Sequence, residues 1–176
     1  MPVMSPAVNS MILVRHGEND SINELTIEGC KQARRLGDLL RDKIDKDWIG
    51  LVSPPAYSLQ TALAITKATG INFDVKVGFH GMVRVYVYLP IMSTIFAEFD
   101  WTSMESSQYL NQESERDFEE RMKTVTTLSN KVVIVTTLDC IDYIIKKVCG
   151  VTKKQTIPFG SATLIQDGRL IYAGAQ

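Results

Sequence analysis

Short apolar runs and longer segments of helical periodicity follow one another along most of this chain. The apolar runs are of the kind that a β-strand shows when both faces of its sheet are covered. They predict strands at 11–15, 48–53, 73–79 and 131–137, of which the run "KVVIVTT" at 131–137 is the clearest. The segment 161–175 predicts a hairpin, because Asp167-Gly168 is a strong two-residue turn signal.

The segments between these strands have the spacing of amphipathic helices. Thr26 is expected to cap a helix that runs to about Lys43. Apolar residues recur on one face of this helix: Cys30, Ala33, Leu36 and Leu40. Further helices are predicted at 56–70, 114–130 and 139–150, two of which close on a glycine, Gly70 and Gly150.

The order of these elements predicts the fold class. Strands and helices alternate as β-α-β-α-β and then α-β-α-β-β, which is typical of a three-layer α/β/α sandwich. We expect a mostly parallel sheet with an antiparallel edge strand. Because 176 residues suit one domain, 11–176 is predicted to be a single domain after a flexible N-terminal segment, 1–10.

Composition narrows the class of protein. Nineteen basic residues nearly balance 20 acidic ones, so neither a nucleic-acid nor an anionic membrane surface is expected. No run approaches the roughly 20 apolar residues of a membrane span, and "MPVMSPAVNS" does not resemble a targeting peptide. The three cysteines show no C-x-x-C pair, which favours a reduced, cytoplasmic compartment over a disulfide framework.

Candidate chemistry gathers at three predicted strand ends. In sheets of this kind, ligands bind beyond the carboxyl ends of the strands. Those ends carry Arg15-His16-Gly17, Ser53-Pro54 and Thr136-Thr137. A strand that delivers an arginine and a histidine to this edge predicts an anion site with a nucleophile in it, and a following helix would add free N–H groups.

Three motifs in order resemble the histidine phosphatase, or phosphoglycerate-mutase-like, superfamily: "RHGE" at 15–18, "LTIEGCKQA" at 25–33 and "SPPAYSLQTA" at 53–62. The resemblance implies the same fold and no metal or organic cofactor. It implies that His16 attacks a phosphoryl group and becomes phosphohistidine, with Arg15 beside the phosphate. Glu18 matches the glutamate that commonly follows the glycine, and with Asn19 it is placed among the substrate-binding residues.

The same resemblance exposes departures from the family pattern. The family's second arginine falls on Tyr57, and its second histidine falls on Thr137. The acid that protonates the leaving group usually lies near 79–82, yet no Asp or Glu occurs from Val75 to Ala97. His80 is then the best candidate for the proton donor. Tyr57 and Thr137, which stand at these two positions, are candidate substrate-binding residues.

Each of these residues also has a plainer interpretation. Arg15 and His16 could serve only to hydrogen-bond carbonyls at the strand end. Tyr57 could be a half-buried helix residue at the pocket mouth, and His80 a structural histidine. Asp139, beside Thr137 at a helix N-terminus, is expected to cap the free N–H groups and to repel phosphate.

Two functions from different classes follow from these motifs. One is a degenerate, pseudo-phosphatase domain with a binding or structural role. The alternative is a weak or unconventional phosphomonoesterase that acts through a phosphohistidine at His16. A phosphorylated small molecule or a phosphoprotein is the expected ligand. The divergent region 80–112 is expected to be an insertion or lid, and its part 83–112, rich in aromatic and apolar residues, could also bind a protein partner.

Overall fold

The computed structural model describes residues 10–53, 55–75 and 130–176. The predicted helix at 114–130 lies outside these residues, apart from Asn130. The same holds for residues 1–9, for the divergent region 80–112 with His80, and for the end of the strand predicted at 73–79.

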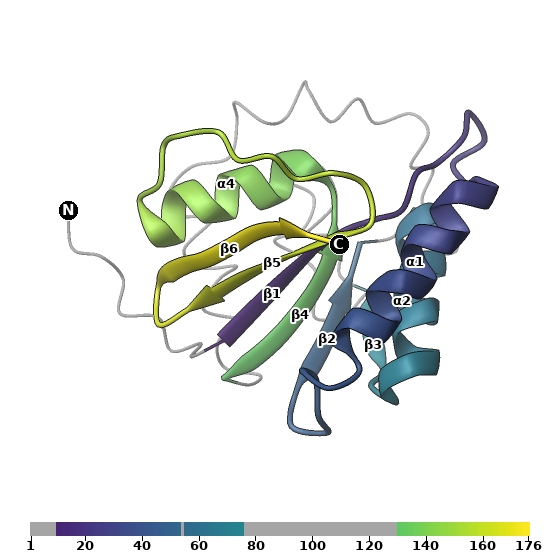
Figure 1. Ribbon diagram of the computed structural model, residues 1–176, viewed down its shortest axis with the longest axis horizontal. Coiled ribbons are helices and arrows are strands. Elements are labelled where there is room, and N and C mark those ends of the chain that lie inside the picture. The colour runs from purple at the N-terminus through teal and green to yellow at the C-terminus, as the bar shows by residue number, and fades with distance from the viewer. Residues whose placement is uncertain (1–9, 54, 76–129) are drawn as a thin grey trace.

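The described residues form a six-stranded sheet in the order β3-β2-β4-β1-β5-β6 (Figure 1). Its strands are β1 (Ser10–Arg15), β2 (Ile49–Val52), β3 (Phe73–Val75), β4 (Lys131–Thr136), β5 (Ser161–Gln166) and β6 (Arg169–Ala175). The pairs β1–β4, β2–β4 and β2–β3 are parallel. The chain turns back at β5, which is antiparallel to β1 on one side and to the edge strand β6 on the other.

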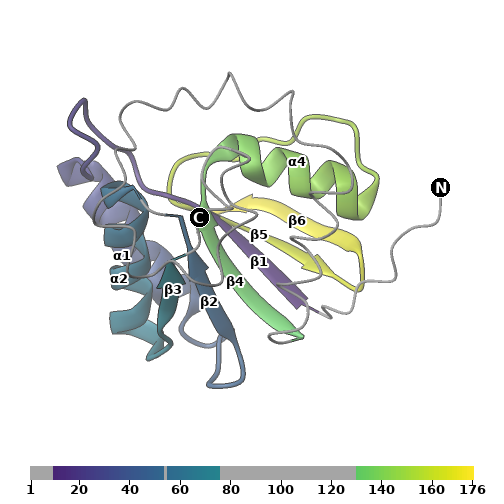
Figure 2. The same ribbon diagram turned by 180° about the vertical axis from the view of Figure 1, so that it is seen from behind.

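Helices cover both faces of the sheet. Helix α1 (Ile27–Leu40) and helix α2 (Ala56–Thr69) lie together on one face, and α4 (Leu138–Cys149) lies on the other (Figures 1 and 2). The predicted three-layer α/β/α sandwich is therefore confirmed. None of the helices in the described part of the chain is long and apolar enough to cross a membrane.

Burial on both faces explains the uninterrupted apolar runs. In β1, Met11 and Leu13 pack toward α4, whereas Ile12 and Val14 pack toward α1 and α2. Each of these side chains is at most 2% exposed. A strand whose alternate residues face two different cores needs no polar position, so it lacks the polar alternation of a half-exposed strand.

Most element ends follow their sequence signals. Thr26 caps α1, since its Oγ1 accepts a hydrogen bond from the Gly29 N–H at 3.0 Å. Gly70 and Gly150 end α2 and α4 at φ 81° and 67°, where a side chain would strain the backbone. The hairpin turns at Asp167-Gly168, with φ 49° and 74°, as a type I′ turn requires.

Several boundaries differ from the prediction, most of them by a single residue. Ser10, predicted to lie in the flexible segment, is the first residue of β1 and pairs with Lys131 and Gln166. Helix α1 ends at Leu40 rather than near Lys43. The N–H of Ile44 bonds to the Leu40 carbonyl, and the side chain of Ile44 is 4% exposed. The chain thus turns after Leu40, and the side chain of Ile44 lies in the core.

Candidate functional site

The predicted strand ends meet at one edge of the sheet. Arg15, the last residue of β1, pairs with Thr136, the last residue of β4. The N–H of His16 then donates to the Thr136 carbonyl at 3.2 Å, and the N–H of Ser53 donates to the Val135 carbonyl at 2.9 Å. The parallel register thus places His16, Ser53 and Thr137 around the same edge.

His16 has a fixed ring orientation. Its side chain is 6% exposed, and Nδ1 lies 2.8 Å from the carbonyl oxygen of Gly17. Because a carbonyl oxygen only accepts, Nδ1 must carry the proton of this bond. In the neutral ring, Nε2 is then the unprotonated nitrogen, which is the atom that a nucleophilic role requires.

Two aromatic rings pack against this imidazole. The Tyr57 ring lies with its centroid 4.1 Å from that of His16, and the Phe159 ring lies at 5.6 Å. Burial raises the pKa of the Tyr57 hydroxyl. Where the resemblance places an arginine, the structure therefore has a neutral aromatic side chain in direct contact with the candidate nucleophile.

The guanidinium of Arg15 contacts the segment that precedes β5. Its Nη1 donates to the Ile157 carbonyl at 2.7 Å, and its guanidinium carbon lies 3.9 Å from the centre of the Phe159 ring. Its Nε is buried without a hydrogen-bond partner among the residues that the structure describes. Burial lowers the pKa of Arg15, while the carboxylates of Asp139 and Asp142 act in the opposite direction.

Thr137 is the N-cap residue of α4, but its side chain makes no capping bond. Its Oγ1 is buried and has no hydrogen-bond partner within the described ranges. The predicted capping by Asp139 is wrong for the part of the chain that the structure describes, where its side chain bonds to none of the helix N–H groups. Asp139 is instead exposed on the first turn of α4, and its charge acts on Arg15.

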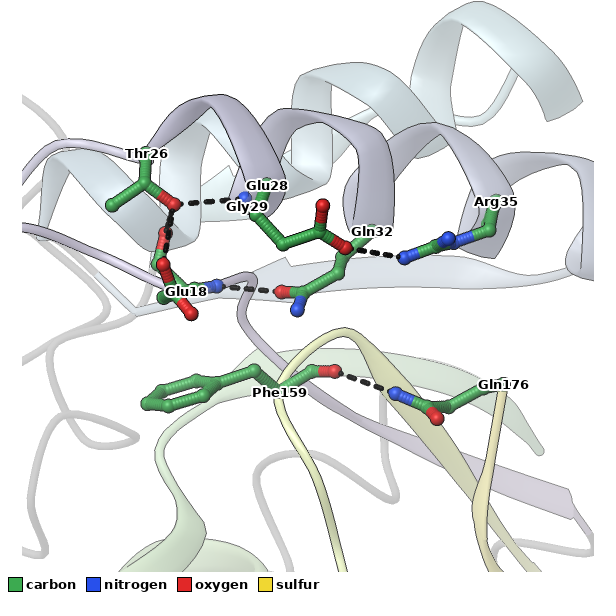
Figure 3. Close-up of polar contacts among 8 residues, drawn as sticks. All are labelled: Glu18, Thr26, Glu28, Gly29, Gln32, Arg35, Phe159 and Gln176. Atoms are coloured by element: carbon green, nitrogen blue, oxygen red, sulfur yellow. Dashed lines mark hydrogen bonds and ion pairs between the residues drawn. The ribbon is translucent and has the colours of Figure 1, made fainter.

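Glu18 and Asn19 make contacts within the loop that follows β1. The Thr26 hydroxyl donates to Glu18 Oε1 at 2.9 Å, and the Glu18 N–H donates to Gln32 Oε1 at 2.8 Å (Figure 3). Asn19 forms an isolated β-bridge with Leu25, and its Nδ2 donates to the Asp20 carbonyl at 3.3 Å. These contacts tie the loop to the start of α1.

Side chains from the second and third motifs hold this loop in place. Thr61 Oγ1 accepts from the Gly17 N–H at 3.1 Å, and Gln60 Oε1 accepts from the Leu25 N–H at 2.8 Å. With Gln32 on the Glu18 N–H, the three motifs are joined by side chain–backbone bonds. The sequence marked these residues as motif positions but could not show that they support the loop that carries His16.

The loop before β5 supplies residues that the sequence gave no reason to select. The N–H of Gly160 bonds to the carbonyls of Arg15 and His16 at 3.1 and 3.0 Å. Gly160 has φ +63°, and a Cβ there would lie 2.5 Å from the Cβ of Gln32. The side chain of Gln176 donates to the Phe159 carbonyl at 3.1 Å (Figure 3). The ring of Phe159 lies beside Arg15 and His16.

His80, the candidate proton donor, lies outside the described residues. Within 10–53, 55–75 and 130–176, no group of three or more His, Cys, Asp or Glu side chains could hold a metal ion.

Comparisons with solved structures agree with this architecture. The chain is similar to mycobacterial glucosyl-3-phosphoglycerate phosphatase in complex with VO3, with TM-score 0.67, 14% identity, and 96% of this chain and 100% of that chain covered. It is similar to the putative phosphohistidine phosphatase SixA from Agrobacterium tumefaciens, with TM-score 0.62, 15% identity, and coverage of 94% and 96%.

A further similar structure is phosphoserine phosphatase from Entamoeba histolytica in complex with 3-phosphoglyceric acid, with TM-score 0.64, 16% identity, and coverage of 95% and 97%. At such identities the likeness establishes the fold alone. A sequence comparison with curated proteins found no match.

The family itself is shown by a sequence model. The model of the histidine phosphatase superfamily (branch 1) matches residues 11–164, which include the strand, loop and helices that build the edge around His16. The chain therefore belongs to the histidine phosphatase superfamily.

Proposed function

We propose that this chain is a pseudo-phosphatase: a histidine phosphatase domain that has lost most phosphoryl-transfer activity and serves in binding or as part of an assembly. The observation that carries the proposal is the contact of Tyr57 with His16, at 4.1 Å between ring centroids. The resemblance to the family assigns this position to an arginine. An aromatic ring there supplies no cation to the transferring group.

The charges around His16 support the proposal. A phosphoryl group in transfer carries dispersed negative charge, which fixed cations and donors must stabilise. Removing one such donor typically costs about 10²–10³ in rate. Arg15 already binds the Ile157 carbonyl, and the carboxylates of Asp139 and Asp142 act on it. An incoming phosphate would meet their repulsion together with a partly engaged cation.

A weak phosphomonoesterase is the second candidate, and one contact favours it. The bond from His16 Nδ1 to the Gly17 carbonyl orients the ring and leaves Nε2 as the basic nitrogen. In this alternative, His16 attacks the phosphoryl group and His80 protonates the leaving oxygen. The three free cysteines are in keeping with a cytoplasmic location for either function.

Hydrolysis assays with two phosphate esters distinguish the candidates. An aryl phosphate such as 4-nitrophenyl phosphate needs little help from an acid, whereas an alkyl phosphate depends on one. We expect both to be hydrolysed at rates close to those of His16→Ala. Alkyl ester turnover in the ordinary enzyme range, with kcat of about 1–10³ s⁻¹, would contradict the pseudo-phosphatase if His16→Ala abolished it.

Phosphate and phosphate monoesters should also bind weakly. Calorimetry with inorganic phosphate and with phosphoserine is expected to give dissociation constants in the millimolar range, or about −4 kcal/mol, or no binding. A sub-micromolar dissociation constant for a phosphate monoester would show that additional cations complete the site, and the pseudo-phosphatase proposal would fail.

A further inference from the structure

Helices α1 and α2 lie side by side over one face of the sheet (Figure 1). Side chains of both helices line a groove. Its volume is about 460 Å³, and its apolar lining includes Ala33, Leu63, Ala64 and Ala68. The helices approach closely because α1 has a glycine at the contact. A Cβ at Gly37 would come within 2.9 Å of the Ala68 Cβ and 3.0 Å of the Ala64 carbonyl oxygen.

The rim of this groove is basic. Among the residues that the structure describes, its lining has three basic side chains, Arg34, Arg41 and Lys67, and one acidic side chain, Asp38, which is a net charge of +2. The carboxylate of Asp38 is already paired with Arg41 at 2.7 Å. Arg34 and Lys67 are exposed, and neither forms an ion pair with any residue in the described ranges.

Apolar side chains are exposed at the same surface. Leu63 lines the groove and is 53% exposed, and Leu59, one turn earlier on α2, is 39% exposed. Exposed cations beside exposed leucines complement a partner that has the opposite charge and an apolar side. The chain as a whole has a net charge of −1, so this positive groove is a local feature.

We propose that the α1/α2 groove, defined by Ala33, Leu63, Ala64 and Ala68 with Arg34 and Lys67 at its rim, binds an acidic amphipathic helix of a protein partner. Apolar residues of the partner at helical spacing would cover Leu63 and the alanine floor. Its flanking carboxylates would pair with Arg34 and Lys67. An amphipathic helix in an apolar groove is a common mode of peptide recognition, and a third helix packs readily on two neighbours.

This surface would give the proposed binding role a partner. It does not require His16, which lies at the edge of the sheet and does not line the groove. A His16→Ala variant should therefore bind the same peptides as the natural protein. Failure of the docking proposal and failure of the pseudo-phosphatase proposal can thus be told apart.

A random library of 14-residue peptides, displayed on phage and selected on the folded protein, tests the proposal. We expect the enriched peptides to combine leucines at i, i+3 or i+4, and i+7 with flanking Asp or Glu. The most enriched peptide is then synthesised with a fluorescent label, and its affinity is measured by anisotropy. A counterpart with lysine in place of every acidic residue should not bind.

Variants of the groove give the decisive comparison. Arg34→Glu with Lys67→Glu, and separately Leu63→Glu, should weaken binding of the selected peptide by at least about tenfold. Lys46→Glu with Lys153→Glu makes the same change of net charge at exposed positions outside the groove and should leave affinity within about twofold. Thermal unfolding of each variant checks that the fold is retained.

Several results would overturn the proposal. No enrichment, enrichment of peptides without acidic residues, or affinity insensitive to the groove variants would each exclude an acidic helix as the occupant. Self-association that Leu63→Glu abolishes would instead assign the groove to a second copy of this chain. Binding to phosphatidylserine vesicles that is lost in the Arg34→Glu, Lys67→Glu variant would assign it to an anionic membrane.

Discussion

The ring of Tyr57 lies against the imidazole of His16, with 4.1 Å between the centroids and 41° between the ring planes. Tyr57 is the second residue of α2, and its N–H bonds to the Asn23 carbonyl in the loop after β1. Its position is therefore fixed by both the helix and the loop. Tyr57 therefore packs on the imidazole, whose Nδ1 bonds to the Gly17 carbonyl, and its neutral ring supplies no positive charge to that contact.

Restoring the cation and the second imidazole should restore part of the chemistry. We predict that Tyr57→Arg with Thr137→His raises kcat/KM for an aryl phosphate by at least about tenfold, since a single oxyanion donor is worth about 10²–10³. Adding Asp139→Gly should raise it further by removing a repulsive charge. Release of the aryl alcohol, followed by absorbance, measures the gain.

Two controls belong to this repair. Leu59→Arg places the same charge on an exposed position of α2 and should give no gain. In the repaired protein His16→Ala should abolish the gain, because the attacking nitrogen is lost. Alkyl phosphates should remain poor substrates, since these changes add no proton donor. A gain that survives His16→Ala would show that the site does not act through His16.

Burial of Tyr57 should make stability fall at alkaline pH. The folded protein holds the pKa of Tyr57 above the ordinary value of 10.0. Between the pKa of the unfolded chain and that of the folded protein, only the folded protein keeps the hydroxyl proton. The contribution of Tyr57 to stability is therefore complete below about pH 10 and is lost as the pH rises through the folded pKa. Tyr57→Phe cannot titrate and should lose less stability over this range.

Urea unfolding of both proteins from neutral pH to above pH 10 measures the effect. The gap between the two free energies of unfolding should change by at most about 1.4 kcal/mol per pH unit, in favour of Tyr57→Phe. All other titrating groups are shared, so they cancel in the comparison. If the free energies of unfolding of the two proteins depended on pH in the same way, the raised pKa of Tyr57 would be contradicted.

The hydroxyl of Thr61 should contribute to stability through the loop that carries His16. It accepts from the Gly17 N–H at 3.1 Å and donates to the Tyr57 carbonyl at 2.7 Å, in a side chain that is 0% exposed. Thr61→Val keeps the shape but leaves a buried N–H unsatisfied, at a cost of about 1–3 kcal/mol. Urea unfolding gives the loss directly.

Thr66→Val provides a matched control on the same helix. The Thr66 side chain makes no hydrogen bond with the described residues, so this change should cost less than about 0.5 kcal/mol. Hydrogen exchange at the Gly17 amide should also become faster in Thr61→Val and stay unchanged in Thr66→Val. Equal losses in the two variants would rule out a special role for the Gly17 contact.

The cysteines should differ in reactivity toward iodoacetamide. Cys30 is exposed, Cys140 is buried, and burial raises the pKa of the Cys149 thiol to about 11. At pH 8 only about one Cys149 in a thousand is a thiolate, the form that reacts. We expect mass spectrometry to find Cys30 modified first, and the Cys149 rate to rise about tenfold from pH 8 to pH 9. Faster reaction of Cys149 than of Cys30 at pH 8 would contradict the raised pKa.

The sequence predicted the layer order and the strand ends because both depend on local patterns. The apolar run at 131–137 and the run at 11–15 do form neighbouring parallel strands, with Leu13 opposite Ile134. Caps at Thr26, Gly70 and Gly150 are also local, because a backbone conformation or one side chain a few residues away decides them. These features required no knowledge of tertiary contacts.

For the candidate site, the sequence predicted only the types of residue that would be present. "RHGE" and the substitutions at 57 and 137 could be found by motif, and the family membership follows from them and from the match over 11–164. The direction in which each side chain points could not be found from the motifs. Nothing near 157–159 in the sequence shows that a carbonyl and an aromatic ring there would bind Arg15.

What the sequence by itself determined, then, was the α/β sandwich and the place of Arg15 and His16 at a strand end. Local spacing and burial fix such features. Only the tertiary structure decided that Tyr57 packs on His16 and that Phe159 and Ile157 engage Arg15. The physical reason is the separation along the chain: Arg15 and Ile157 are 142 positions apart. Contacts over such distances arise only when the sheet pairs β1 with β4 and β5.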